Sequence, residues 1–189
     1  MTLVLASTSA IRRHMLDAAG VEYAAVKPEV DEDELKLGLA NASAIALRLA
    51  NAKAVSVPGA WVIGSDSVVA CGGRLFNKPR DRDEAAEHLR FFSGKAMELS
   101  SAAALARAGS LDWSHVETAR LDVRTLSDAF IGDYLDAEWP EVGYTVGVFR
   151  LEARGVQLFE RIEGDYFTIL GMPILPLLGA LRERGLLPA

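Results

Sequence analysis

Residues 61–95 read WVIGSDSVVACGGRLFNKPRDRDEAAEHLRFFSGK, and this stretch indicates the fold more clearly than any other part of the chain. Apolar runs on both sides of Gly64 are typical of buried strand, and the glycine itself predicts a break between them. Gly72-Gly73 predicts a hairpin turn. Asp81 then predicts the N-cap of a helix that runs to about Phe92. A strand, a hairpin and a helix in succession favour an α/β fold.

A carboxylate interrupts the apolar pattern of this segment. Asp66, flanked by Ser65 and Ser67, lies between the two apolar halves of the expected strand. Burial of an isolated carboxylate is too costly, so the group must be hydrogen-bonded, paired with a cation or bound to a metal. Asp66 is therefore the strongest single candidate for chemistry.

The start of the chain predicts an anion-binding turn. Residues 2–6, TLVLA, are typical of a short buried strand, and Ser7-Thr8-Ser9 are favoured helix N-cap residues. A helix is expected to follow and to stop at Gly20. Free N–H groups at such a turn bind phosphates, and Arg12 and Arg13 add two cations. The alternative is an ordinary capped helix with solvated arginines.

A second helix is expected over residues 41–57, and it carries one unusual cation. Ile45, Leu49 and Lys53 fall at i, i+4 and i+8, so Lys53 extends an apolar stripe. Its ammonium must either reach outward to water or meet an anion. Before this helix, the acidic run 28–34 predicts a solvated loop or the acidic first turn of the next helix.

The remainder of the chain predicts further elements. They are a hairpin over 96–126 with its turn near Gly109, a helix capped by Ser127, a loop over 140–147, strands over 148–150 and 156–162, and a final helix over 175–184.

Composition limits the class of protein. The chain has 189 residues, of which 50% are hydrophobic, and a formal net charge of −6. The acidic balance argues against binding of a nucleic acid polymer but not against a nucleotide substrate. Cys71 is the only cysteine, so no internal disulfide is expected and a reducing, cytoplasmic location is favoured. The longest apolar stretch, 169–181, is broken by glycines and prolines, so no membrane anchor is expected.

Several common sites are excluded by their missing motifs. There is no GxGxxG, Gly94-Lys95 is not followed by the Ser or Thr of a P-loop, and Ser65 lies in no GxSxG elbow. The three histidines and one cysteine show no zinc spacing. What remains is a metal-dependent phosphohydrolase, in which carboxylates hold a divalent cation and Arg and Lys hold a polyphosphate.

Seven blocks, in order from residue 3 to about 185, resemble one known family. LVLASTSAIRRHML, PEVDE, RLANAKA, VIGSDSVV, NKPRD, FFSGK and FERIEGDYFTILGMP are similar to the signatures of the Maf-like nucleoside triphosphate pyrophosphatases. The resemblance implies one domain over 1–189, with an elongated mixed sheet, flanking helices and two lobes around a cleft, akin to the inosine triphosphate pyrophosphatases. It also implies a homodimer that hydrolyses a nucleoside triphosphate to the monophosphate and diphosphate with Mg²⁺ or Mn²⁺.

The resemblance also implies roles for individual residues. Ser7, Arg13, Lys53 and Lys78 would bind the substrate's phosphates. Asp66 would be the catalytic proton acceptor, and Glu32 would share the metal with Asp66.

Within the family, the chain is similar to the 7-methyl-GTP pyrophosphatase branch. The positions that set base choice there correspond to Ile11, Ser67 and Glu152. Glu152 matches the branch, and its carboxylate suits the N–H edge of guanine. Ile11 and Ser67 depart from it, since the branch has an aromatic residue and an amide there, and Val146-Gly147 replaces the usual Ala-Gly. An alternative function that the family implies is a nucleotide-sensing regulator of cell division and septum formation.

Overall fold

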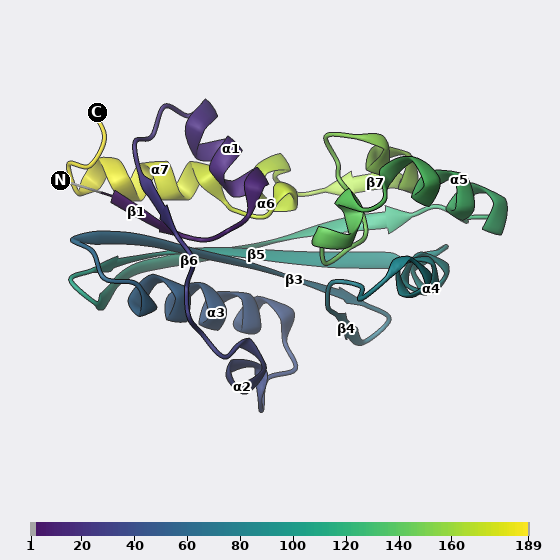
Figure 1. Cartoon of the computed structure of the whole chain (residues 1–189), viewed down its shortest axis with the longest axis horizontal. Helices are drawn as coiled ribbons and strands as arrows, with labels where there is room; N and C mark the ends of the chain where they lie inside the picture. The colour runs from purple at the N-terminus through teal and green to yellow at the C-terminus, as the bar shows by residue number, and fades with distance from the viewer. Residues whose placement is uncertain (1–2, 189) are drawn as a thin grey trace. The chain divides into compact units, whose positions relative to one another are not determined.

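The computed structural model describes residues 3–188, and it contains seven strands and seven α-helices within that range (Figure 1). The strands are β1 (Leu3–Ala6), β2 (Ala24–Val26), β3 (Trp61–Cys71), β4 (Arg74–Phe76), β5 (Ala96–Arg107), β6 (Ser110–Val123) and β7 (Phe159–Glu163). The helices are α1 (Ala10–Ala18), α2 (Glu32–Lys36), α3 (Ala42–Ser56), α4 (Arg82–Phe92), α5 (Asp128–Glu138), α6 (Tyr166–Leu170) and α7 (Ile174–Glu183), with 3-10 turns η1 (Glu141–Tyr144) and η2 (Arg154–Leu158).

The strands form one mixed sheet in the order β2-β1-β3-β5-β6-β7, with β4 paired to β3. β1 is parallel to both β2 and β3, whereas β4 and β7 are antiparallel to their partners. The predicted α/β class with a mixed sheet and flanking helices is therefore confirmed. Thr2, which the sequence assigns to the first strand, lies outside the described residues.

The described chain divides into two compact units. The first unit holds residues 3–67, 100–118 and 165–188, and the second holds 68–99 and 119–164.

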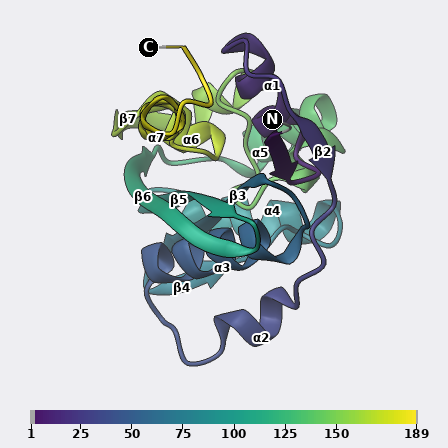
Figure 2. The ribbon, with the colours of Figure 1, turned by 90° about the vertical axis from the view of Figure 1, so that its left-hand side faces the viewer.

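In the first unit, helices cover both faces of the sheet. Helices α1, α6 and α7 lie on one face and α3 lies on the other, as the end-on view makes plain (Figure 2). Alternate residues of β1 and β3, such as Leu5 and Ile63, pack with Leu16 of α1 and Leu177 of α7 in a single buried cluster. The apolar runs of these strands thus reflect burial between two layers of helix.

Gly64 does not break the strand, contrary to the sequence prediction, because β3 runs without interruption from Trp61 to Cys71. A Cβ at Gly64 would lie 2.1 Å from the Ala50 carbonyl oxygen and 2.5 Å from the Ala54 nitrogen. Glycine is needed here because the backbone of α3 packs directly against the strand, and not because the chain bends.

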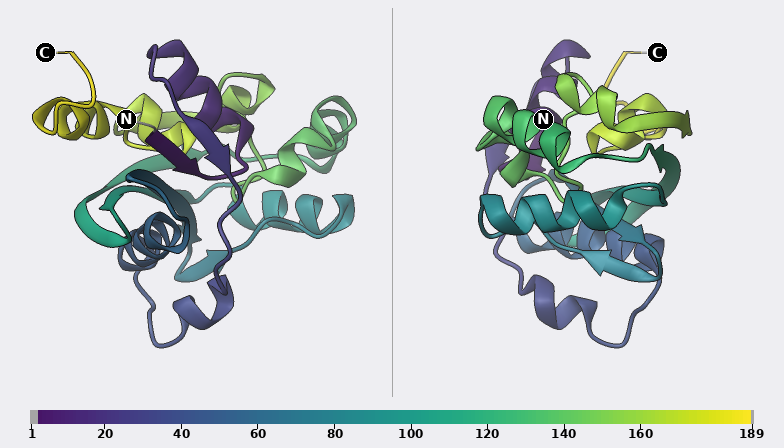
Figure 3. Two further views of the ribbon diagram at one scale, coloured as in Figure 1. Left: turned by 60° about the vertical axis from the view of Figure 1, so that its left-hand side comes forward. Right: turned by 90° about the vertical axis from the view of Figure 1, so that its right-hand side faces the viewer.

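The second unit is built around the predicted hairpin and two helices. β3 and β4 pair through Cys71 and Arg74 across the Gly72-Gly73 turn, as expected. Asp81 caps α4 through Glu84 N, and Ser127 caps α5 through Phe130 N, so both predicted N-caps are confirmed. The two helices lie next to each other in the views of Figure 3.

One predicted strand of the second unit is wrong, and another is confirmed only in its second half. Residues 148–150 form no strand, because Val148 adopts a positive φ of 56° and its carbonyl accepts the Tyr134 hydroxyl. The strand expected over 156–162 begins only at Phe159, because η2 precedes it. In η2, Gly155 packs so closely on Arg150 that a Cβ would lie 2.5 Å from its carbonyl oxygen.

The other predicted elements agree with the structure. α3 fills most of 41–57, β5 and β6 form a hairpin through Ala108-Gly109, α7 matches 175–184 within one residue, and the loop over 140–147 contains only η1. The acidic run forms the first turn of a helix, as one alternative expected, but this helix is the separate short α2, which the sequence did not predict. Asp31 caps α2, and Glu32, Asp33 and Glu34 form its first turn. No helix within residues 3–188 has the length and apolar character needed to cross a membrane.

Candidate active site

The ammonium of Lys53 joins two carboxylates from different elements. Its Nζ lies 2.7 Å from Oε1 of Glu32, in the first turn of α2, and 3.0 Å from Oδ2 of Asp66, on β3. The Lys53 side chain is only 10% exposed, and it leaves α3 in the last turn. Of the two alternatives for this residue, the ammonium meets anions and does not reach into water.

Asp66 is held by cations and by the backbone. Besides Lys53, its Oδ1 accepts the backbone N–H of Ser67 at 2.8 Å and lies 3.9 Å from Nη2 of Arg12. The Asp66 side chain is 13% exposed, so pairing offsets most of the cost of its burial. The sequence argument that this carboxylate needs partners is confirmed.

Arg12, and not its neighbour Arg13, is the second cation beside Asp66, after Lys53. Arg12 shares a helix face with Met15 and Leu16, at i+3 and i+4, and both of these are buried. Arg13 is exposed, and its backbone oxygen accepts the hydroxyl of Tyr23 at 3.3 Å. Burial lowers the pKa of Arg12, while Asp66 and Glu32 act against that shift. Sequence reasoning named both arginines but assigned only Arg13 to the site, although the helical period of Arg12, Met15 and Leu16 could have pointed to Arg12.

The turn between β1 and α1 forms beside this cluster. Ser7 is buried, and its hydroxyl accepts the N–H of Ser9 at 3.2 Å. Ser9 is the N-cap of α1, and its hydroxyl accepts the N–H of Arg12 at 3.5 Å. Ile11 is half-buried in the first turn. The capped helix is thus confirmed, and phosphate binding at the same turn stays a prediction.

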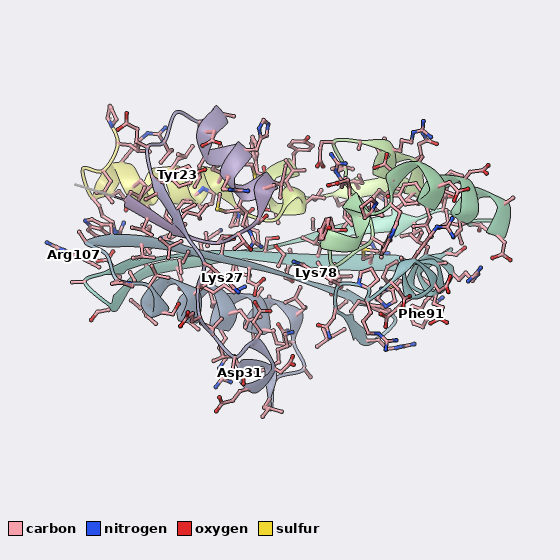
Figure 4. All side chains as sticks on the ribbon, in the orientation of Figure 1. Tyr23, Lys27, Asp31, Lys78, Phe91 and Arg107 are labelled. Carbon is pink, nitrogen blue, oxygen red and sulfur yellow. The ribbon has the colours of Figure 1, made fainter. Side chains whose placement is uncertain are left out.

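The remaining predicted site residues belong to the second unit. Lys78 is exposed and lies two residues after the end of β4 (Figure 4). Glu152 is exposed between η1 and η2, and its Oε1 lies 3.4 Å from Nε of Arg150. The contacts that unite Glu32, Lys53 and Asp66 all lie within the first unit.

Glu32 and Asp66 are the candidate ligands for a divalent cation. Within residues 3–188, no three Asp, Glu, His or Cys side chains gather as a metal site of their own. Glu32 and Asp66 nevertheless already share one cation, the ammonium of Lys53. Mg²⁺ is commonly bound by one or two carboxylates together with substrate phosphates and waters. Two carboxylates that converge on one positive charge therefore fit such a metal when the substrate supplies the other oxygens.

The model of the family described as Maf-like protein covers residues 2–184, and the chain belongs to this family.

Two pyrophosphatases share nearly half of their residues with this chain over its full length. It is 48% identical to the 7-methyl-GTP pyrophosphatase of Rhizobium meliloti (strain 1021), over 99% of this chain and 98% of the relative. It is 47% identical to the nucleoside triphosphate pyrophosphatase of Sphingopyxis alaskensis, over the whole of both chains. A solved dITP/XTP pyrophosphatase from Mycobacterium abscessus overlaps 67% of this chain and 76% of its own, with 18% identity and a TM-score of 0.40, which is too weak a likeness to carry an argument.

Proposed function

We propose that this protein hydrolyses a nucleoside triphosphate to the nucleoside monophosphate and diphosphate, as an enzyme that removes modified nucleotides from the cellular pool. The observation that carries the proposal is the pairing of Lys53 with both Glu32 and Asp66. The relatives that are 48% and 47% identical to it carry pyrophosphatase names, which supports the same reaction class.

In the proposed reaction a water molecule attacks the α-phosphorus. The new bond joins the water oxygen to the α-phosphorus. The bond between the α-phosphorus and the oxygen that bridges it to the β-phosphorus breaks, and diphosphate leaves. Asp66 takes the proton of the attacking water as a general base. Arg12, Arg13, Lys53 and Lys78 offset the charge of the phosphates, and Ser7 and the start of α1 supply hydrogen bonds.

Glu32 and Asp66 would hold the divalent metal, Mg²⁺ or Mn²⁺. When bound, this cation supplies positive charge against the phosphate oxygens. Without it, Lys53 keeps the two carboxylates together, so the ligands are already gathered before a metal and substrate arrive.

For the substrate we propose a guanine-type triphosphate such as 7-methyl-GTP. Glu152 is exposed, and a carboxylate accepts hydrogen bonds from the N1–H and amino group of guanine. The proposal further includes a cytoplasmic homodimer that acts on free nucleotides and needs neither a nucleic acid polymer nor a membrane.

The test is a panel of nucleoside triphosphates, each with Mg²⁺, with Mn²⁺ and with EDTA, followed for diphosphate release and for nucleotide products by chromatography. We expect the monophosphate and diphosphate as first products, and only with metal. A nucleoside diphosphate with free phosphate would contradict the proposed bond cleavage. Tight nucleotide binding without turnover would favour the regulator alternative.

A further inference from the structure

The carbonyl oxygen of Gly171 collects three hydrogen-bond donors in the first unit. It accepts Nε of Arg12 at 2.9 Å, the Ser67 hydroxyl at 3.0 Å and the Ser65 hydroxyl at 3.2 Å. Gly171 ends α6 with a φ of 114°, a conformation that favours glycine. The loop between α6 and α7 is therefore held against β3 and α1 through one backbone atom.

The hydroxyl of Ser67 has no proton left for a further partner. Its Oγ lies 3.0 Å from the Gly171 oxygen, 2.9 Å from the Ser101 hydroxyl and 3.1 Å from Nη2 of Arg12. A hydroxyl has one proton and two lone pairs. Ser101 donates its own proton to the Thr168 carbonyl at 2.7 Å, so the Ser67 proton goes to Ser101 or to Gly171, and the Ser67 oxygen accepts Nη2 of Arg12. Ser67 as it stands cannot donate a hydrogen bond to a nucleotide base without giving up an internal one.

The same contacts fix the guanidinium of Arg12. Nε is bound to the Gly171 oxygen and Nη2 to the Ser67 hydroxyl, and two anchoring points determine the orientation of a planar group. The side chain is 11% exposed, and the anchored Nη2 is the atom that lies 3.9 Å from Oδ1 of Asp66. A lysine at position 12 could not occupy both anchors with the geometry of a guanidinium.

We propose that Ser67 and the Gly171 carbonyl position Arg12 beside Asp66, and that Ser67 thereby affects the rate of the reaction for every base rather than the choice of base. Ser67 is a positioning residue that acts through Arg12. The effect on rate rests on the proposed function, whereas the positioning of Arg12 does not.

The kinetic test compares Ser67→Ala with Ser67→Thr, which keeps the hydroxyl. Loss of one hydrogen bond to a charged group changes a rate by roughly 10-fold or more. We therefore expect Ser67→Ala to lower kcat about 10-fold for GTP, 7-methyl-GTP and UTP alike, with the ratios of kcat/KM between bases unchanged, and Ser67→Thr to restore most of it. A change of the base ratios would mean that Ser67 reads the base and would overturn the proposal.

A buried serine outside this network provides the matched control. The Ser100 hydroxyl shares a 2.7 Å hydrogen bond with Thr118 and makes no contact with Arg12 or Gly171. Ser100→Ala therefore removes one buried hydroxyl from the same sheet, and we expect kcat to stay at the wild-type value. An equal loss of kcat in Ser100→Ala and Ser67→Ala would overturn the positioning role.

A nuclear magnetic resonance readout is independent of activity. The Nε–H signal of Arg12, identified by its loss in Arg12→Lys, is expected to exchange slowly with water in the wild type, in Ser67→Thr and in Ser100→Ala. In Ser67→Ala the guanidinium loses one anchor, so exchange should be faster. Unchanged exchange in Ser67→Ala would overturn the inference even if the enzyme is active. Because the measurement needs no turnover, it tests the positioning of Arg12 even if the proposed function is wrong.

Discussion

The 3.0 Å contact between Lys53 Nζ and Asp66 Oδ2 depends on a backbone contact two residues before Asp66. At Gly64, β3 approaches α3 so closely that a Cβ would collide with the Ala50 oxygen and the Ala54 nitrogen. Ala54 follows Lys53 in the helix, so the strand and the lysine are brought together by this packing. The absence of one side chain at Gly64 therefore sets the distance between the cation and the carboxylate.

Gly64→Ala tests this relationship. The added methyl group must displace α3 or β3, and overpacking of this kind costs about 1–3 kcal/mol of the free energy of unfolding. We expect a lower urea midpoint and a loss of activity, because Lys53 moves with the helix. Gly132→Ala is the control, since a Cβ there meets nothing within 4 Å and alanine stabilises a helix by about 0.5–1 kcal/mol. An unchanged midpoint in Gly64→Ala would refute the packing argument.

Asp66→Asn should abolish turnover while the fold persists. The amide has nearly the same shape but accepts no proton and holds a dication poorly, so kcat should fall by roughly 10²- to 10⁴-fold. Diphosphate release and the urea midpoint of the same preparation are measured together. Activity within a factor of two of the wild type would remove Asp66 from the mechanism.

Metal dependence should be sensitive to Glu32 and insensitive to its neighbour Asp33. Glu32→Gln removes one of the two proposed carboxylate ligands, and we expect the Mg²⁺ concentration for half-maximal activity to rise at least about 10-fold. Asp33 is exposed and lies 3.7 Å from Lys36, away from Lys53, so Asp33→Asn should leave that concentration unchanged. Equal metal curves for the wild type and Glu32→Gln would place the metal elsewhere.

Base choice should depend on Glu152. A hydrogen bond to a charged partner contributes about 1.5–3 kcal/mol, which is roughly 10- to 150-fold in kcat/KM. Glu152→Gln should therefore reduce the preference for GTP over UTP by a sizeable part of that range, whereas Glu160→Gln, an exposed acid of the same unit, should not. With Ile11 in place of an aromatic ring, 7-methyl-GTP should exceed GTP only slightly or not at all, because the cationic base lacks a stacking partner. Preference for a pyrimidine in the wild type would contradict the role of Glu152.

The sequence predicted most elements of the fold, because their signals are local. Asp81 and Ser127 are N-caps that act on the next three residues, and Gly72-Gly73 closes a turn between neighbouring strands. The strand predictions over 148–150 and at the start of 156–162 failed because contacts from distant residues override local preference. The Tyr134 hydroxyl holds Val148, and Gly155 packs on Arg150.

The sequence by itself determined which charged groups need a partner inside the fold, since a carboxylate inside an apolar strand and a lysine on an apolar helix face are both too costly to bury alone. Only the tertiary structure decided that Lys53 and Asp66 are each other's partners, that the Arg12 side chain is only 11% exposed while Arg13 is exposed, and that Gly64 marks a close approach instead of a break. The physical reason is that burial and pairing depend on where separate elements pack. The sequence pattern of one element specifies its buried face, but the residue that meets this face belongs to another element.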